Sequence, residues 1–260
     1  MYIRFTIPFH KYQREKRVTI CLPDDYFQSA ERYPTLYIHD GQNAFFDEKS
    51  YMGVSWGFSD YVHDHHLKVI MVAIDCIFDD FGRMDEYGPW PLRHEINDPY
   101  THDPSRVLGG QGDDYIRWII EDLKPLVDRR FRTLPDQTSM IGSSMGGIIT
   151  AYAYFKYPWV FKKCAALSTA FFLYMDEFID LIEHAPTHGE GLYFDCGDHE
   201  GVGNADEDRA YIETNFAIDQ LLNEKGLPHS FHFFEDTTHN EKEWRKRMPL
   251  YMNYLYGEGE

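Results

Sequence analysis

The segment TSMIGSSMGGIIT, residues 138–150, constrains the fold of this chain more than any other. Its pattern predicts a short apolar strand, a tight turn that carries a serine, and the start of a helix. Gly142 and Gly146 flank Ser144 in a G-x-S-x-G pattern. Glycine is expected at both positions because the two arms of such a turn pass close to one another. The helix that follows directs its unpaired N–H groups towards negative charge that develops beside Ser144.

Apolar strand-like runs alternate with amphipathic helical segments along the chain, which is typical of a doubly wound α/β sheet. Two N-terminal runs, Tyr2–Phe9 and Arg17–Leu22, are close enough in sequence to form a hairpin. Further strands are expected at 35–39, 69–75, 138–142, 164–168, 191–196 and 229–234. Helices are expected at 56–66, 113–130, 145–157, 175–184, 206–225 and 240–255. No repeat or linker is visible, so residues 1–260 are predicted to form a single domain.

One region departs from this alternation. Residues 76–112 show little regular pattern and are rich in Pro, Gly, aromatic and charged residues. Long loops in compact domains are usually functional walls or lids. Because aromatic residues are available there for packing, we expect an ordered wall or lid of a functional site.

The charge balance of the chain restricts its partners. The sequence has 43 acidic and 25 basic residues and a net charge of −18, which argues against nucleic acid or an anionic membrane as the main partner. A signal-peptide core is missing from the N-terminal segment, and no apolar run reaches the roughly 18 residues of a membrane span. We therefore expect a cytoplasmic protein. The widely spaced cysteines are expected to be buried free thiols; they are Cys21, Cys76, Cys164 and Cys196.

The residues that follow Ser144 include partners for nucleophilic chemistry. A serine hydroxyl is a weak nucleophile unless a base takes its proton, and a carboxylate best orients that base. In hydrolases with such a turn the acid and then the histidine follow the serine along the chain. His239 follows the last expected strand, at the sheet edge where ligands bind. The candidate acids lie at the end of the preceding strand; they are Asp195, Asp198 and Glu200.

The chain also offers a second N–H donor for a developing oxyanion. In this type of sheet that donor comes from the loop after the third strand, and it acts beside the N–H that follows the nucleophile. Asp40 and Gly41 form a predicted turn in the segment YIHDGQNAFF. This turn exposes the backbone N–H of Gln42.

Six segments in order along nearly the whole chain resemble one protein family. They are YIHDGQNAFF (37–46), RMDEYGPW (83–90), residues 110–133, IGSSMGG (141–147), LYFDCGDHEG (192–201) and THNEKEWRKRMP (238–249). The chain is similar in them to the putative esterase family of α/β-hydrolases, which includes feruloyl esterases, enterochelin esterases and mycolyltransferases. The resemblance implies an α/β-hydrolase fold, a mostly parallel sheet of about eight strands with helices on both faces.

The resemblance also implies roles for particular residues. It implies Ser144 as the nucleophile, His239 as the base, and the N–H groups of Gln42 and Met145 as the oxyanion hole. In relatives the acid follows a Cys-Gly-Thr-x or similar turn, which falls here on residues 196–199 and implies Glu200 as the acid. This chain has Asp198 where threonine is usual, so Glu200 and Asp198 both stay candidates.

Several aromatic side chains are candidates for contact with substrate. Each either stacks on an aromatic acyl group or anchors a loop; they are Trp90, Tyr87, Phe45 and Trp56. The acidic chain has no evident basic field for an anionic substrate. Three arginines of the long loop are the local source that the sequence suggests; they are Arg83, Arg93 and Arg106.

The sequence thus predicts a serine carboxylic ester hydrolase that forms an acyl-enzyme, acting on short-chain acyl or aryl esters. The partner is a small-molecule ester, and a homodimer is a reasonable expectation. No metal or cofactor is expected, and HDHH at 63–66 is interpreted as structural because the helix macrodipole favours histidine near a C-terminus. Two alternatives are an acyltransferase with the same triad and a non-catalytic binding protein that retains the fold.

Overall fold

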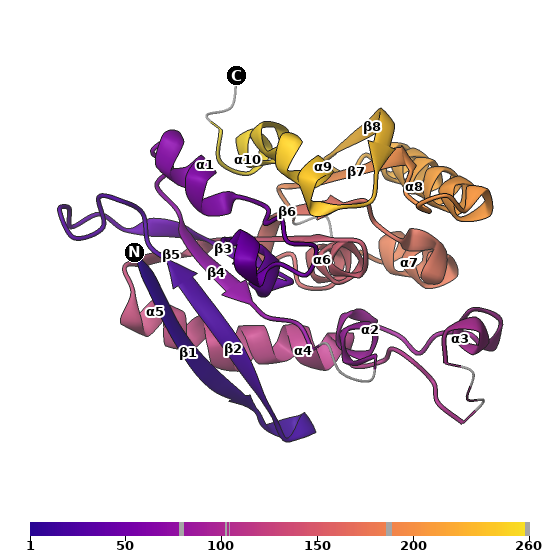
Figure 1. Cartoon of the computed structure of the whole chain (residues 1–260), viewed down its shortest axis with the longest axis horizontal. Coiled ribbons are helices and arrows are strands. Elements are labelled where there is room, and N and C mark those ends of the chain that lie inside the picture. Colours follow the sequence, from indigo (N-terminus) through magenta and orange to yellow (C-terminus); the bar gives the residue numbers. More distant parts are fainter. Residues whose placement is uncertain (78–80, 102, 104, 186–188, 258–260) are drawn as a thin grey trace. The chain divides into compact units, whose positions relative to one another are not determined.

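The structure is a computed structural model that describes residues 1–77, 81–101, 103, 105–185 and 189–257 of the chain (Figure 1). The chain forms two compact units, each built from separate stretches of sequence. Unit 1 consists of Met1–Cys76, Trp118–Ile141 and Asn240–Glu260, and unit 2 consists of Ile77–Arg117 and Gly142–His239. Both units combine strands with helices, as the alternating pattern of the sequence predicts.

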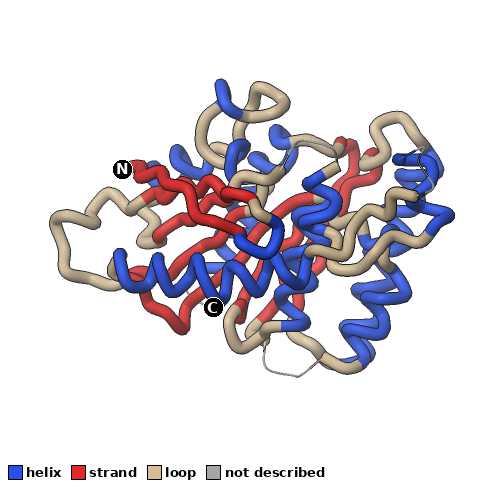
Figure 2. The backbone as a smooth tube through the Cα atoms, turned by 90° about the horizontal axis from the view of Figure 1, so that it is seen from below, coloured by secondary structure: helices blue, strands red, loops and turns tan. Residues whose placement is uncertain are grey.

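The strands of unit 1 lie side by side in the order β1-β2-β4-β3-β5. Their bounds are β1 Tyr2–Phe9, β2 Arg14–Cys21, β3 Tyr33–Ile38, β4 Ile70–Ile74 and β5 Thr133–Ser143. β1 and β2 form the predicted antiparallel hairpin, which starts at the N mark in Figure 2. β2 is also antiparallel to β4, whereas β3 is parallel to β4 and to β5.

Burial explains why the strands of unit 1 differ in sequence. β4 reads IMVAI and is buried at every position, which is typical of a parallel strand that is covered on both faces. β1 alternates exposed and half-buried residues and has only β2 as a neighbour. Helices α1 (Phe58–Asp64) and α10 (Met248–Tyr256) pack on one another through Phe58 and Tyr251. In Figure 1 these two helices lie on the opposite side of the strands from α5 (Lys124–Arg130).

Unit 2 contains three parallel strands in the order β6-β7-β8. They are β6 Phe161–Leu167, β7 Gly191–His199 and β8 His229–Thr238. Helix α6 (Met145–Lys156) contacts β6, and α8 (Ala205–Lys225) contacts β7. Helix α7 (Met175–Glu183) contacts both of these helices. Of the six strand pairings described above, four are parallel, which confirms the predicted mostly parallel sheet.

The remaining described elements are short. In unit 1 they are the 3-10 turns η1 His10–Tyr12, η2 Gly41–Asn43 and η3 Asp47–Lys49, the π-helical turn η4 Ile119–Leu123, and helix α9 Glu241–Lys246. In unit 2 they are the 3-10 turn η5 Phe171–Leu173 and helices α2 Gly82–Tyr87 and α3 His94–Thr101. Helix α4 (Gly112–Trp118) runs through η4 into α5, in place of the single helix expected at 113–130.

The region 76–112 has more regular structure than its sequence predicts. It contains α2 and α3, and residues 78–80, 102 and 104 lie outside the described part. The buried carboxylate of Asp85 organises it, because it forms an ion pair with Arg106 and accepts a hydrogen bond from the Gly109 N–H at 3.0 Å. These contacts hold described residues of this region together, and its role as a wall or lid stays a prediction.

The structure also tests two expectations from composition. All four cysteines are free and buried, as predicted. None of the described helices combines the length and apolar character that crossing a membrane requires.

Candidate active site

Ser144 lies at the turn between β5 and α6. Its backbone has φ 58° and ψ −121°, a conformation that costs a non-glycine residue about 1–3 kcal/mol. The flanking glycines make the turn possible, because a Cβ atom on Gly142 would lie 2.6 Å from the carbonyl carbon of Gly146. The predicted close approach of the two arms is thus confirmed. A strained serine in a tightly packed turn is held in one position by its surroundings.

Helix α6 is fixed tightly to the end of β6. The N–H of Ser144 donates to the carbonyl of Leu167 at 2.9 Å, and a Cβ on Gly147 would lie 2.6 Å from Oγ1 of Thr169. The carbonyl of Ser144 accepts from the N–H of Ile148, which closes the first turn of the helix. The N–H groups at the start of this helix, including that of Met145, have no partner within the helix. They are suited to stabilise negative charge beside the serine.

The structure brings Glu200 and His239 together. Oε2 of Glu200 lies 2.7 Å from Nδ1 of His239. The carboxylate is fully buried, whereas the imidazole is partly exposed. Glu200 directly follows β7 and His239 directly follows β8, so two parallel neighbouring strands deliver the pair to the same edge. The ring of Tyr211, on α8, lies 5.5 Å from the imidazole and packs against it.

Glu200 is held as a carboxylate. Its other oxygen, Oε1, accepts hydrogen bonds from Ser168 Oγ at 2.7 Å and from the Gly197 N–H at 2.5 Å. Burial by itself raises the pKa of Glu200, but the hydrogen bond and charge of His239 and the bonds from Ser168 and Gly197 outweigh it. The pKa is therefore lower than that of an ordinary glutamate. An ionised, buried carboxylate can orient an imidazole and stabilise its protonated form.

Asp198, the other candidate acid, has a different set of partners. Its carboxylate accepts hydrogen bonds from the N–H groups of Asp236 and Thr237, both at 3.0 Å. Burial acts to raise the pKa of Asp198, and these backbone bonds lower it below the ordinary value. Asp198 thus fixes the end of β8 just before His239. This geometry favours a structural role for Asp198 and leaves Glu200 beside the imidazole.

Ser168 is a residue that the sequence did not single out. It has a left-handed backbone with φ 43°, and its N–H donates to the buried carboxylate of Asp195 at 3.0 Å. Its hydroxyl donates to Glu200. Since the Leu167 carbonyl accepts the N–H of Ser144, the end of β6 and the residue after it support both the serine turn and the acid. The only sequence signal was its place at the end of the strand expected at 164–168.

The described part of 76–112 also contacts the serine turn. A guanidinium nitrogen of Arg83 donates to the carbonyl of Ser143 at 3.3 Å, and the group stacks over Tyr87 at 5.2 Å. Arg93 forms an ion pair with Asp176, and Arg106 pairs with Asp85. The guanidinium groups of Arg93 and Arg106 are therefore neutralised by carboxylates. They do not form the local basic field that the sequence suggested.

The four aromatic candidates lie in different surroundings. Tyr87 and Trp56 are buried in the core, where Trp56 stacks on Phe58 at 5.4 Å. Their burial favours the anchoring alternative for both. Trp90 is partly exposed, packs on Tyr152, and lines a pocket of unit 2 of about 420 Å³. Phe45 lines a pocket of unit 1, beside the loop that carries Gln42.

The loop after β3 forms the turn predicted at Asp40 and Gly41. Asp40 has a left-handed backbone with φ 51°, and a Cβ on Gly41 would lie 2.6 Å from the carbonyl carbon of Ala73. The side chain of Gln42 is clamped to the end of β4. Its Oε1 accepts from the Cys76 N–H at 3.1 Å, and its Nε2 donates to Cys76 Sγ at 3.5 Å. These contacts fix the backbone of Gln42.

One cluster within the described residues has the donor atoms of a cation site. Ligand atoms of Asp198, His199 and Asp236 lie within 4.8 Å of one another. The Asp198 carboxylate already accepts two backbone hydrogen bonds, so its oxygens hold the backbone at the end of β8. The HDHH segment has local partners: His63 pairs with Asp24 at 2.6 Å, and His65 bonds to the carbonyl of Tyr61 at 2.9 Å. These contacts agree with its structural interpretation.

The chain is similar to known proteins over nearly its whole length. The family model described as "Putative esterase" matches residues 10–252. The Uncharacterized protein YbbA of Bacillus subtilis (strain 168) is 24% identical over 249 residues, which span 94% of this chain and 93% of that protein.

Solved structures with the same fold include hydrolases. An IroE-like serine hydrolase from Shewanella oneidensis aligns with a TM-score of 0.76 and 19% identity over 98% of this chain and 81% of its own. The siderophore hydrolase EstA from Aspergillus nidulans aligns with a TM-score of 0.75 and 17% identity over 97% and 94% of the two chains. A ferulic acid esterase gives a TM-score of 0.68 and 15% identity over 98% and 97%. These likenesses confirm the predicted α/β-hydrolase fold.

Proposed function

Since the chain belongs to the Putative esterase family and is an esterase, we propose that it hydrolyses carboxylic esters through a Ser144, His239 and Glu200 triad. The observation that carries the proposal is the 2.7 Å contact between Glu200 Oε2 and His239 Nδ1. It occurs in the same unit as the strained turn of Ser144. A buried carboxylate that orients a histidine, together with a strained serine at a helix start, is the arrangement that nucleophilic ester cleavage needs.

Each group has one chemical task in the proposed reaction. The hydrogen bond to Glu200 keeps the proton of the neutral imidazole on Nδ1, and Nε2 of His239 accepts the proton of the Ser144 hydroxyl in this reaction. The serine oxygen then attacks the ester carbonyl carbon, and the carbonyl oxygen becomes an oxyanion. The N–H groups of Met145 and Gln42 donate to that oxyanion in this proposal.

The intermediate then collapses to an acyl-enzyme. The bond from the carbonyl carbon to the alcohol oxygen breaks, and His239 gives its proton to the leaving alcohol. In the second half a water molecule gives a proton to His239 and attacks the acyl carbon. Collapse of this second intermediate returns the proton to Ser144 and releases the carboxylic acid. No step requires a cofactor.

The contacts around Glu200 suit it to this reaction. Its lowered pKa keeps it ionised at neutral pH, where it stabilises the imidazolium that forms in each half-reaction. Ser168 and Gly197 hold its second oxygen, so the carboxylate cannot rotate away from the histidine. Such preorganised groups lower the barrier because they need no rearrangement during the reaction.

The proposed substrates are short-chain acyl or aryl esters. Partly exposed Trp90 and the contact of Arg83 with Ser143 support a role for this region as a wall of the substrate site. The structurally similar proteins include a ferulic acid esterase and a siderophore hydrolase. Esters with an aromatic acyl group are therefore part of the proposed range.

Hydrolysis of p-nitrophenyl esters from acetate to octanoate, together with methyl ferulate, tests this function. The wild-type protein should hydrolyse at least one of them, and the Ser144→Ala protein should not. The chain-length profile then gives the size of the acyl pocket. Turnover that survives in folded Ser144→Ala protein would contradict the proposal, as would a folded wild-type protein that cleaves none of the esters.

A further inference from the structure

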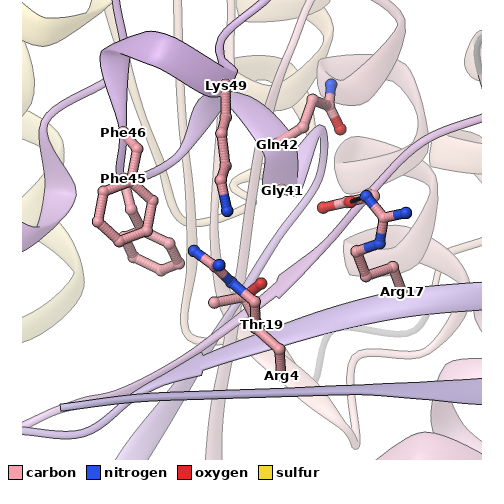
Figure 3. Close-up of a pocket in the computed structure, with 9 residues that line it drawn as sticks. Arg4, Arg17, Thr19, Gly41, Gln42, Phe45, Phe46 and Lys49 are labelled. Carbon is pink, nitrogen blue, oxygen red and sulfur yellow. Dashed lines mark hydrogen bonds and ion pairs between the residues drawn. The ribbon is translucent and has the colours of Figure 1, made fainter.

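Unit 1 contains a pocket of about 390 Å³ whose lining is unusually basic for this chain. Three of its residues are cationic: Arg4 from β1, Arg17 from β2 and Lys49 from η3 (Figure 3). We call this cavity the basic pocket. The whole chain has 43 acidic and only 25 basic residues, so three cations around one pocket are not expected from composition. Their convergence makes this the place to look for an anionic ligand.

Arg4 and Lys49 share one aromatic ring. The Arg4 guanidinium lies 5.2 Å from the ring centre of Phe46, and the Lys49 ammonium lies 5.4 Å from it. In Figure 3 the two side chains extend towards one another from opposite sides of the pocket. Among the described residues neither forms an ion pair with a carboxylate. Two like charges over one ring repel each other, and an anion between them would remove that repulsion.

Arg17 and Asp75 complete the charges of the lining. Arg17 lies 3.4 Å from Asp75, which is the one acidic residue of the pocket wall. Burial raises the pKa of Asp75 above the ordinary value, against the opposing effect of Arg17 and the other nearby cations. One carboxylate faces three cations, so the lining keeps an excess of positive charge. This excess is available to a ligand.

The form of the pocket indicates which anion it fits. A guanidinium fork pairs with a carboxylate through two parallel hydrogen bonds, and an ammonium adds a point charge. Phe45 and Phe46 supply an apolar wall for the carbon skeleton of the same ligand. The volume lies in the range of small-molecule sites, about 300–1,000 Å³. The lining therefore fits a small organic carboxylate better than a large or uncharged molecule.

The basic pocket also includes Gln42, whose N–H is an oxyanion donor in the proposed reaction. We propose that the basic pocket binds a free carboxylate of the substrate, so that the preferred substrate is an ester carrying a second, unesterified carboxylate. This inference rests on the proposed esterase function. It names the substrate class and assigns selectivity for charge to Arg4 and Lys49.

Matched pairs of anionic and neutral esters test the inference. Mono-4-nitrophenyl glutarate against 4-nitrophenyl valerate places the carboxylate on the acyl side. The pair 4-acetoxybenzoate and 4-acetoxybenzamide places it on the alcohol side. The wild-type protein should prefer the anion in one pair by about tenfold or more in kcat/KM, the size expected for a charge-assisted contact. The pair that shows the preference identifies the side of the ester that the pocket holds.

Two variants and a control locate the preference. Arg4→Gln and Lys49→Gln should each remove most of the anion preference and leave kcat/KM for the neutral ester nearly unchanged. Arg209→Gln is the control, because Arg209 is an exposed cation on α8 that does not line the pocket. It should leave both values unchanged. An anion preference that survives in the Arg4→Gln, Lys49→Gln double variant would overturn the inference, as would a wild type without any preference.

Calorimetric titration with glutarate separates this inference from the esterase function. The wild-type and Ser144→Ala proteins should both bind glutarate, and the double variant should not. Ser144-dependent cleavage of neutral esters without glutarate binding would overturn the carboxylate pocket and leave the esterase function intact. Glutarate binding that depends on Arg4 and Lys49, in a protein that cleaves no ester, would support the pocket and overturn the esterase function. Tighter binding of inorganic phosphate than of glutarate would contradict the carboxylate assignment.

Discussion

The surroundings of Glu200 and the basic pocket handle charge in opposite ways. Glu200 is buried, and its two oxygens accept bonds from His239, Ser168 and Gly197. Its charge is neutralised within the fold. Arg4 and Lys49 are exposed, lie over the same ring, and form no ion pair among the described residues. The positive charge of the basic pocket is left for a ligand.

This difference separates the proposed chemistry from the proposed selectivity. A preorganised acid and base can act on any ester whose carbonyl reaches the serine, because their positions do not depend on the substrate. Unpaired cations discriminate between substrates, because only an anion relieves their repulsion. Changes around Glu200 should therefore affect all esters alike, and changes in the basic pocket should affect anionic esters alone.

The largest effect is expected at the nucleophile. Ser144→Ala should lower kcat/KM for every ester by roughly 10⁴-fold or more, since the strained backbone position belongs to Ser144, the proposed nucleophile. The melting temperature should not fall. Ser143→Ala is a matched control one residue away and should keep activity within about tenfold of wild type. Equal losses in the two variants would indicate a disturbed turn and not a lost nucleophile.

The next largest loss of activity is expected when the proposed acid, Glu200, is changed. Glu200→Gln should lower kcat/KM by about 10³ to 10⁴-fold for neutral and anionic esters alike, because the amide favours the wrong tautomer of His239. Asp198→Ala should instead lower the unfolding free energy by about 1–3 kcal/mol, since the N–H groups of Asp236 and Thr237 lose their acceptor. Its activity should stay within about tenfold of wild type. The reverse pattern would make Asp198 the acid.

Ser168 should show a smaller effect of a different kind. Ser168→Ala removes one of the donors that lower the pKa of Glu200. The acid limb of the kcat/KM profile should move to higher pH, and activity at neutral pH should fall by about tenfold. An unshifted profile in the alanine variant would exclude this positioning role.

The pH dependence of stability gives a further test. The pKa of Glu200 is lower in the folded than in the unfolded chain, so its ionisation stabilises the fold. This contribution to the unfolding free energy is fully present at a pH above the unfolded pKa. It is lost as the pH falls through the folded pKa. Urea denaturation should therefore show wild type more stable than Glu200→Gln at pH 7, with the difference shrinking below about pH 4.5. If the stability difference between wild type and Glu200→Gln stays constant with pH, the lowered pKa of Glu200 is contradicted.

The smallest predicted effect is on stability, and it is a gain in place of a loss. Without ligand, Arg4→Gln should leave the unfolding free energy unchanged or raise it by at most about 0.5 kcal/mol, because a like-charge contact is removed. The gain should decrease with added salt. Saturating glutarate should reverse it, since only wild type is stabilised by bound anion. A loss of stability in low salt would mean that Arg4 already has a compensating partner.

Local sequence rules predicted much of this molecule. The apolar run of β4 and the glycines around Ser144 act through neighbours in sequence, and both were predicted correctly. The short helices α2 and α3 were not predicted, because residues 76–112 are held by long-range contacts such as Asp85 with Arg106 and not by a periodic apolar face.

Contacts between distant residues explain the other omissions. Ser168 supports Glu200 across 32 positions of sequence, and no pattern in either segment indicates the pair. In the basic pocket, Arg4 and Lys49 come from distant segments and lie over the ring of Phe46. Lys49 is placed there by the turn η3. The net charge of −18 gave no hint of it, since a sum over the chain does not show where cations gather.

Covalent labelling of the nucleophile tests the central claim most directly. A fluorophosphonate probe should modify the folded protein once, and peptide mapping by mass spectrometry should place the adduct on Ser144. Glu200→Gln should label much more slowly, because the His239 base is no longer oriented. An adduct on any other residue, or no adduct on folded wild-type protein, would contradict the proposed serine esterase.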